Sequence, residues 1–120
     1  MILADTSIWV QHFRRGVPDF AAALIKHRIS IHSVVIGEVA MGNLSRRTET
    51  LADLGRLPRA STGTMDECLA FLERHSLHGR GLGWNDIQLL VAAKLSGHTL
   101  WSIDRRLAAE AEKLGVAHRG

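Results

Sequence analysis

Four acidic side chains lie at positions where their types and surroundings indicate metal-dependent chemistry: Asp5, Glu38, Asp86 and Asp104. Asp5 and Asp104 each end a short apolar run that predicts a strand, and Asp86 lies in the first turn of a predicted apolar helix. Because ligands of open α/β sheets bind at the carboxyl ends of the strands, we expect these acids to converge on one edge of the sheet. Carboxylates in one cleft repel one another, and a hard divalent cation such as Mg²⁺ or Mn²⁺ relieves that repulsion. One or two such ions can activate water and stabilise the leaving oxygen of a phosphodiester.

Glu38 is the most informative of these acids, because its segment SVVIGEVAMG predicts a helix that is apolar nearly all round. A glutamate is almost never fully buried without a partner, since burying a lone carboxylate is costly. Glu38 is therefore expected to pair with a cation, to take up a proton or to face a metal ion at the same sheet edge. No basic residue lies within one helical turn of it, so a salt bridge would have to come from elsewhere in the fold.

Each aspartate also has a purely structural interpretation. Asp104 can cap the helix that follows it, and Asp86 is favoured by the helix dipole in a first turn. Asp5 is harder to explain in this way, because Thr6 and Ser7 follow it and either hydroxyl could cap the next helix. The metal-site interpretation therefore depends on the convergence of the whole set.

Strands and helices are predicted to alternate along the chain. Expected strands cover residues 1–4, 29–31, 59–61, 99–103 and 116–118. A first helix is expected from about residue 6 to Gly16, and further helices are expected over residues 19–26, 33–44, 48–57, 64–75, 84–96 and 104–114. Strands separated by helices indicate an α/β fold with a parallel sheet and helices on both faces. The 120 residues fit one domain, and no repeat or linker divides them, so a single domain over residues 1–120 is expected.

The composition allows a nucleic-acid partner and argues against several other classes of protein. The chain has 15 Lys and Arg against 12 Asp and Glu, a net charge of +3, and its arginines form the doublets Arg14–Arg15, Arg46–Arg47 and Arg105–Arg106. Such doublets fit either solvated helix ends or contacts with a phosphate backbone. Cys68 is the only cysteine, so no intrachain disulfide is expected and a reducing cytoplasm is the expected location. The sequence predicts neither a bilayer-spanning run nor a signal peptide, so no membrane association is expected.

Four segments together resemble the PIN-domain family, and more narrowly its VapC-type toxins: ADTSIWV, VVIGEVAMGNL, GLGWNDIQLLVAAKLSG and LWSIDRRL. The resemblance covers nearly the whole chain. It implies an α/β/α sandwich with a doubly wound parallel sheet, and endonuclease cleavage of RNA with Mg²⁺ or Mn²⁺. It implies that the catalytic, metal-binding acids are Asp5, Glu38, Asp86 and Asp104. The implied partners are an RNA substrate, a second copy of the chain in a homodimer, and a small antitoxin that wraps the toxin and holds it inactive.

Residues beside the acids match the pattern of this family with one departure. Thr6 or Ser7 matches the hydroxyl that follows the first acid, and Ser102 stands where the family usually has threonine. Many relatives carry a further acid or asparagine and then a phenylalanine after the last acid, whereas two arginines and a leucine follow Asp104 here. This departure leaves open a fifth acidic contribution and a second metal ion.

Three basic side chains are the expected contacts to an RNA backbone: Arg80, Arg105 and Arg106. The glycine-rich loop of residues 78–83, which holds Arg80, equally fits a hinge before the next helix, and it lacks the spacing of nucleotide-binding motifs. Two other functions stay open: a nuclease that acts on DNA, since nothing in the sequence reads a 2′-hydroxyl, and a non-catalytic module that binds RNA or protein. A haloacid-dehalogenase-like phosphatase is disfavoured, because Ser7 stands where that chemistry needs a second aspartate.

Overall fold

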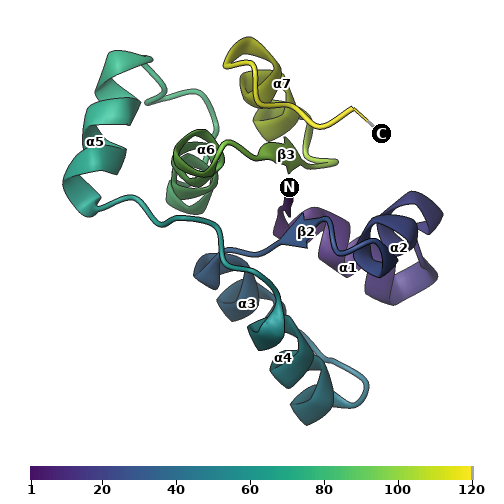
Figure 1. Cartoon of the computed structure of the whole chain (residues 1–120). Coiled ribbons are helices and arrows are strands. Elements are labelled where there is room, and N and C mark those ends of the chain that lie inside the picture. Colours follow the sequence, from purple (N-terminus) through teal and green to yellow (C-terminus); the bar gives the residue numbers. More distant parts are fainter. Residues whose placement is uncertain (120) are drawn as a thin grey trace.

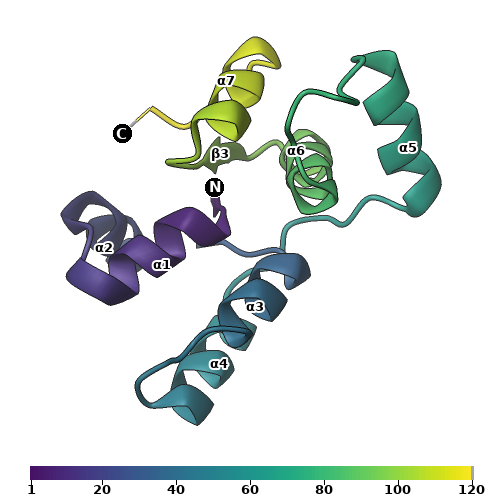
Figure 2. The same cartoon turned by 180° about the vertical axis from the view of Figure 1, so that it is seen from behind.

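A short parallel sheet lies at the centre of the molecule, with its strands in the order β2-β1-β3. In the computed structural model, which describes residues 1–119, β1 is Ile2–Ala4, β2 is Ile29–Ser30 and β3 is Thr99–Trp101. The helices are α1 (Thr6–Arg15), α2 (Pro18–Ile25), α3 (Ser33–Ala40), α4 (Arg47–Arg56), α5 (Met65–Arg74), α6 (Trp84–Ser96) and α7 (Arg105–Lys113). α1 and α2 lie on one side of the strands and α5 and α6 on the other, and the α3–α4 hairpin projects from the body (Figure 1 and Figure 2). The predicted α/β/α arrangement with a parallel sheet is confirmed.

The sheet forms where short apolar runs can be buried on both faces, as in other parallel sheets. Leu3 of β1 is fully buried and lies in register with Ser30 of β2 and Leu100 of β3. β3 ends at Trp101, two residues before the predicted end, because the next residue turns its side chain toward the end of β1. All three strands therefore stop at the same edge, where the polar residues begin.

Two segments predicted as strands, residues 59–61 and 116–118, form one parallel bridge each instead. Pro58 precedes the first of these segments and has no amide hydrogen to donate to a ladder. Ile31 still donates to the carbonyl of Pro58 and accepts from the amide of Ala60, so the pairing there is limited to a single bridge.

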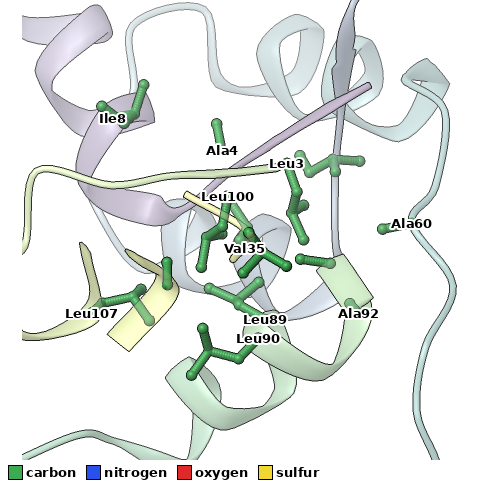
Figure 3. Packing of buried hydrophobic residues seen from close by; sticks show 14 of the residues in the cluster. Leu3, Ala4, Ile8, Val35, Ala60, Leu89, Leu90, Ala92, Leu100 and Leu107 are labelled. Atoms are coloured by element: carbon green, nitrogen blue, oxygen red, sulfur yellow. The ribbon is translucent and has the colours of Figure 1, made fainter. Parts of the chain in front are cut away.

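The core lies between the sheet and α6, which is buried over much of its surface. Figure 3 shows Leu89 and Leu90 of α6 beside Leu3, Leu100 and Val35, all of them almost completely buried. α6 has 13 residues, and no helix in the described part of the chain is both long and apolar enough to cross a membrane. Because α6 carries Asp86 in its first turn, the packing of this helix also positions one member of the acidic set.

Several helices differ from the predicted ranges at their ends, and two of these differences have local reasons. α2 begins at Pro18 and not at Asp19, because the fixed φ of proline suits the first position of a helix. α3 ends at Ala40, four residues before the predicted end. The Arg47 guanidinium donates to the carbonyls of Ala40 at 2.6 Å and Gly42 at 3.0 Å, which satisfies backbone groups that a longer helix would have paired. One arginine of the second doublet therefore has a structural role.

Candidate active site

The four predicted acids line one cleft of about 170 Å³ at the carboxyl edge of the sheet. Asp5 follows β1, Glu38 lies in α3, Asp86 lies in the first turn of α6, and Asp104 precedes α7. Thr6, Ser7 and Leu89 complete the lining, and no lysine or arginine of the described residues takes part in it. The topology therefore places four carboxylates around one space.

Asp5 is the buried member of the set, with only 5% of its surface exposed. Its Oδ1 accepts from the Ser7 hydroxyl at 2.5 Å and the amide of Ile8 at 3.2 Å, and its Oδ2 accepts from the Ser102 hydroxyl at 2.5 Å. Burial raises the pKa of Asp5, and the charge of Asp86 raises it further, whereas the three hydrogen bonds oppose this shift. Asp5, and neither of the following hydroxyl residues, is the N-cap of α1, so it has both a structural role and a place in the cleft.

Asp86 and Asp104 likewise combine capping with a position in the cleft. The Asp86 Oδ2 accepts from the amide of Gly83 at 2.9 Å, and the Asp104 Oδ1 accepts from the amides of Arg106 at 3.0 Å and Leu107 at 3.1 Å. In each carboxylate these bonds engage one oxygen only. Burial raises the pKa of Asp86, and the charges of Asp104 and Glu38 add to this effect, against the Gly83 hydrogen bond. The capping interpretation of Asp104 was therefore correct, Asp86 does lie in the first turn of α6, and neither structural role competes with a place in the cleft.

Glu38 reaches the cleft, but the burial predicted for it is wrong. Its side chain is exposed, and its Oε1 accepts from the Thr6 hydroxyl at 2.7 Å. α3 buries only Val35 and Val39, whereas Met41, just beyond the helix, is 88% exposed. The helix packs with α1 and α4, and Val34 and Ile36 are partly buried against the core, so Glu38 lies on the side of α3 that meets solvent. A position beside α1 brings Glu38 to the other acids, without any need to bury its charge.

Two serine hydroxyls join the strand ends that carry the acids. Ser102 donates to Asp5 and accepts from the amide of Asp104 at 3.0 Å. Ser7 donates to the other oxygen of Asp5 and accepts from the amide of Ile103 at 3.1 Å. Together they connect the end of β1, the segment after β3 and the start of α7. The residues chosen from the sequence as supporting ones thus lie in the hydrogen-bond network of the cleft.

The arginines predicted to contact RNA lie outside the lining of the cleft. All three are exposed, but the side chain of Arg106 also lies against Gly81, and Arg80 forms an ion pair with Glu110 at 3.3 Å. Sequence reasoning did not find Glu110, because this carboxylate meets its partner across 30 residues of chain.

The donor set of the cleft fits a hard divalent cation in its chemistry. All four acids offer carboxylate oxygens, and two of them have raised pKa values because of burial and mutual repulsion. Within residues 1–119, no three His, Cys, Asp or Glu side chains converge closely enough to hold one ion by themselves. Mg²⁺ commonly binds through one or two carboxylates and keeps several water ligands, so this spacing agrees with its chemistry.

Comparison with known proteins gives the same class as the fold and the cleft. Residues 2–114 match the PIN domain family. Over 118 residues the chain is 38% identical to Ribonuclease VapC32 of two Mycobacterium tuberculosis strains. The match covers 98% of this chain and 95% of that protein. The chain therefore belongs to the PIN domain family, and within it to the VapC type, as the sequence motifs predicted.

Two solved structures share the fold. FitAcB from Neisseria gonorrhoeae has a TM-score of 0.66 and 16% identity, and the match covers 98% of this chain and 95% of that one. PAE2754 from Pyrobaculum aerophilum has a TM-score of 0.61 and 19% identity, with 94% of this chain and 85% of that one covered. At such low identities the likeness concerns the arrangement of the backbone alone.

Proposed function

We propose that this protein is a Mg²⁺- or Mn²⁺-dependent endoribonuclease and the toxin of a toxin–antitoxin pair. The observation that carries the proposal is the cleft with four carboxylates, in whose lining no lysine or arginine of residues 1–119 takes part. The 38% identity to a protein named Ribonuclease VapC32 supports RNA as the substrate. On this proposal the chain is one domain that acts in the cytoplasm as a homodimer and is held inactive by a small cognate antitoxin.

The four acids take different roles according to their surroundings. Asp5, Asp86 and Asp104 hold the ion, directly or through water, each with an orientation set by protein donors. Glu38, exposed at the rim and steadied by Thr6, orients the hydrolytic water. A bound divalent ion lowers the pKa of water and neutralises charge that develops on the phosphate. Ser7 and Ser102 keep Asp5 in place and favour its charged form.

The direct test is cleavage of a mixed RNA pool and a mixed single-stranded DNA pool by the purified protein. We expect RNA to be cut with Mg²⁺ or Mn²⁺, no cutting with EDTA, and loss of cutting in Asp86→Asn. Asparagine keeps an oxygen for the Gly83 amide, so this variant removes the charge without removing the cap. Cleavage of DNA alone would contradict the choice of substrate, and cleavage that persists in EDTA would contradict the metal-dependent site.

A further inference from the structure

The loop before α6 is held to α7 by an ion pair whose acidic partner is buried. Arg80 Nη2 lies 3.3 Å from Glu110 Oε1, and Lys113 Nζ lies 3.7 Å from the same oxygen. Glu110 is only 7% exposed, although it is charged. A charge is seldom buried to this extent unless it is paired, so the basic partners are what allow Glu110 to lie there.

A second contact between the same two segments involves Gly81 and Arg106. Gly81 has a φ of +80°, and a Cβ atom there would lie 2.5 Å from Nη1 and 3.0 Å from Cδ of Arg106. The Arg106 side chain therefore covers this glycine closely, and a larger residue would displace it. We call Arg80, Gly81, Arg106 and Glu110 together the α7 clamp.

The α7 clamp connects the two segments that present Asp86 and Asp104. The loop that holds Arg80 and Gly81 leads to Gly83, whose amide donates to the Asp86 carboxylate at 2.9 Å. α7, which carries the other half of the clamp, is capped by Asp104. Because the Gly83 amide bonds the Asp86 carboxylate, a shift of the loop relative to α7 would change the orientation of this carboxylate relative to Asp104.

We propose that the α7 clamp is a positioning device that fixes Asp86 relative to Asp104, with Glu110 and Arg80 as its main positioning residues. The inference rests on the proposed function for its effect on RNA cleavage. Its effects on the loop and on metal affinity can be measured without any nuclease activity. It also assigns Arg80 and Arg106 to internal contacts, in place of the RNA contacts that the sequence suggested.

The test compares Arg80→Met and Glu110→Gln with the matched control Lys113→Met in the full-length protein. Lys113 pairs with the same carboxylate but lies on α7 itself, so its loss leaves the loop attached. In the two clamp variants we expect faster hydrogen exchange at the Gly83 amide. We also expect Mn²⁺ affinity by calorimetry and kcat for RNA each to fall by about 10–100-fold, with KM nearly unchanged. Lys113→Met should match the wild type in all three measurements, and Arg80→Lys should recover part of the loss.

An RNA-contact role for Arg80 gives a different pattern and would overturn the proposal. Arg80→Met would then raise KM and lower the salt dependence of binding, while Glu110→Gln, which frees Arg80, would leave cleavage intact or improve it. Unchanged Gly83 exchange in both clamp variants would also overturn it. If Glu110→Gln fails to fold, Arg80→Met decides, since Arg80 is 40% exposed. If the wild type cuts no RNA but the clamp variants show faster exchange and weaker Mn²⁺ binding, the clamp stands and the proposed function fails.

Discussion

The hydroxyl of Ser102 lies 2.5 Å from Oδ2 of Asp5 and ties the chain after β3 to the end of β1. The two residues are 97 positions apart in the sequence, yet this bond orients the most buried acid of the cleft. It favours the charged form of Asp5, which burial disfavours. On the proposed function, the carboxylate is thus kept available as a metal ligand at a place where a lone acid would tend to take up a proton.

Ser102→Ala tests this bond. Removing the donor should raise the pKa of Asp5 further above its ordinary value, because burial then acts with less opposition. The acid limb of the activity profile should move to higher pH, and cleavage near neutral pH should fall by about 10-fold. Ser102→Thr keeps the hydroxyl and should retain the wild-type profile. An unchanged pH profile in Ser102→Ala would show that the bond does not influence the acid.

Asp86→Asn should make the metal-free protein more stable while it abolishes cleavage. The pKa of Asp86 is raised in the folded state, so this group favours folding below its unfolded pKa and loses that effect as the pH rises through the folded value. At neutral pH the charged carboxylate therefore lowers the free energy of unfolding. We expect the Tm of Asp86→Asn in EDTA to be higher than that of the wild type at pH 7, and the difference between the two Tm values to be smaller at pH 4. A lower Tm at pH 7 would contradict this account of the cleft's repulsion.

His32 makes the stability of α3 sensitive to acid. It is 2% exposed and its Nδ1 accepts from the amide of Val34, which caps the helix that carries Glu38. Burial lowers the pKa of His32, and the nearby charge of Arg59 lowers it further. The neutral ring contributes its full stabilisation above the unfolded pKa of about 6.5, and this is lost as the pH falls toward the lower folded value.

Urea unfolding at pH 7.5 and pH 5.5 measures this effect. Asparagine can accept the same hydrogen bond and does not titrate, so His32→Asn should lose less stability on acidification than the wild type. Partly buried histidines with lowered pKa values, such as His12, keep part of this pH dependence of stability in place. His78→Asn, at an exposed position, is the matched control, and its free energy of unfolding should change between the two pH values as that of the wild type does. An equal change in the free energy of unfolding in all three proteins would exclude His32 as a source of the acid sensitivity.

Arg105 is the arginine of the last doublet that remains an expected RNA contact. Its side chain is exposed at the start of α7, beside the cleft acid Asp104. Arg105→Ala should weaken RNA binding for all sequences alike and lower the slope of log K against log salt by about one. Arg56→Ala, which removes an exposed ion pair on α4, should leave the slope unchanged. An unaltered slope in Arg105→Ala would remove this residue from the RNA surface.

The convergence of the three aspartates could be predicted because it follows from parallel strands that end at one edge. Local patterns place Asp5 and Asp104 after apolar runs that predict strands. In open α/β sheets the carboxyl ends of such strands lie at the edge where ligands bind, so these acids are expected to lie close together. Glu38 was chosen by an argument about burial that the structure contradicts, and it reaches the cleft through the packing of α3 on α1. The short hydrophobic run in its segment does not show which face of α3 packs against another helix.

Contacts between distant segments were beyond what the sequence could show. Arg80 in a glycine-rich loop has the same local pattern whether it binds a phosphate or a carboxylate, and its partner Glu110 lies 30 residues away. The bridges at residues 59–61 and 116–118 were overestimated as strands because β propensity does not reveal how many residues find a partner. Both errors concern tertiary pairing and not local conformation.

The central claim is that these carboxylates hold a divalent ion on which RNA cleavage depends. The most direct measurement is calorimetric titration of Mn²⁺ into the wild type and Asp5→Asn, with RNA cleavage by the same samples and Tm as the check on folding. The account predicts that the wild type binds Mn²⁺ and cuts RNA, and that folded Asp5→Asn loses cutting and most of its affinity. Wild-type affinity and cleavage in Asp5→Asn would contradict it.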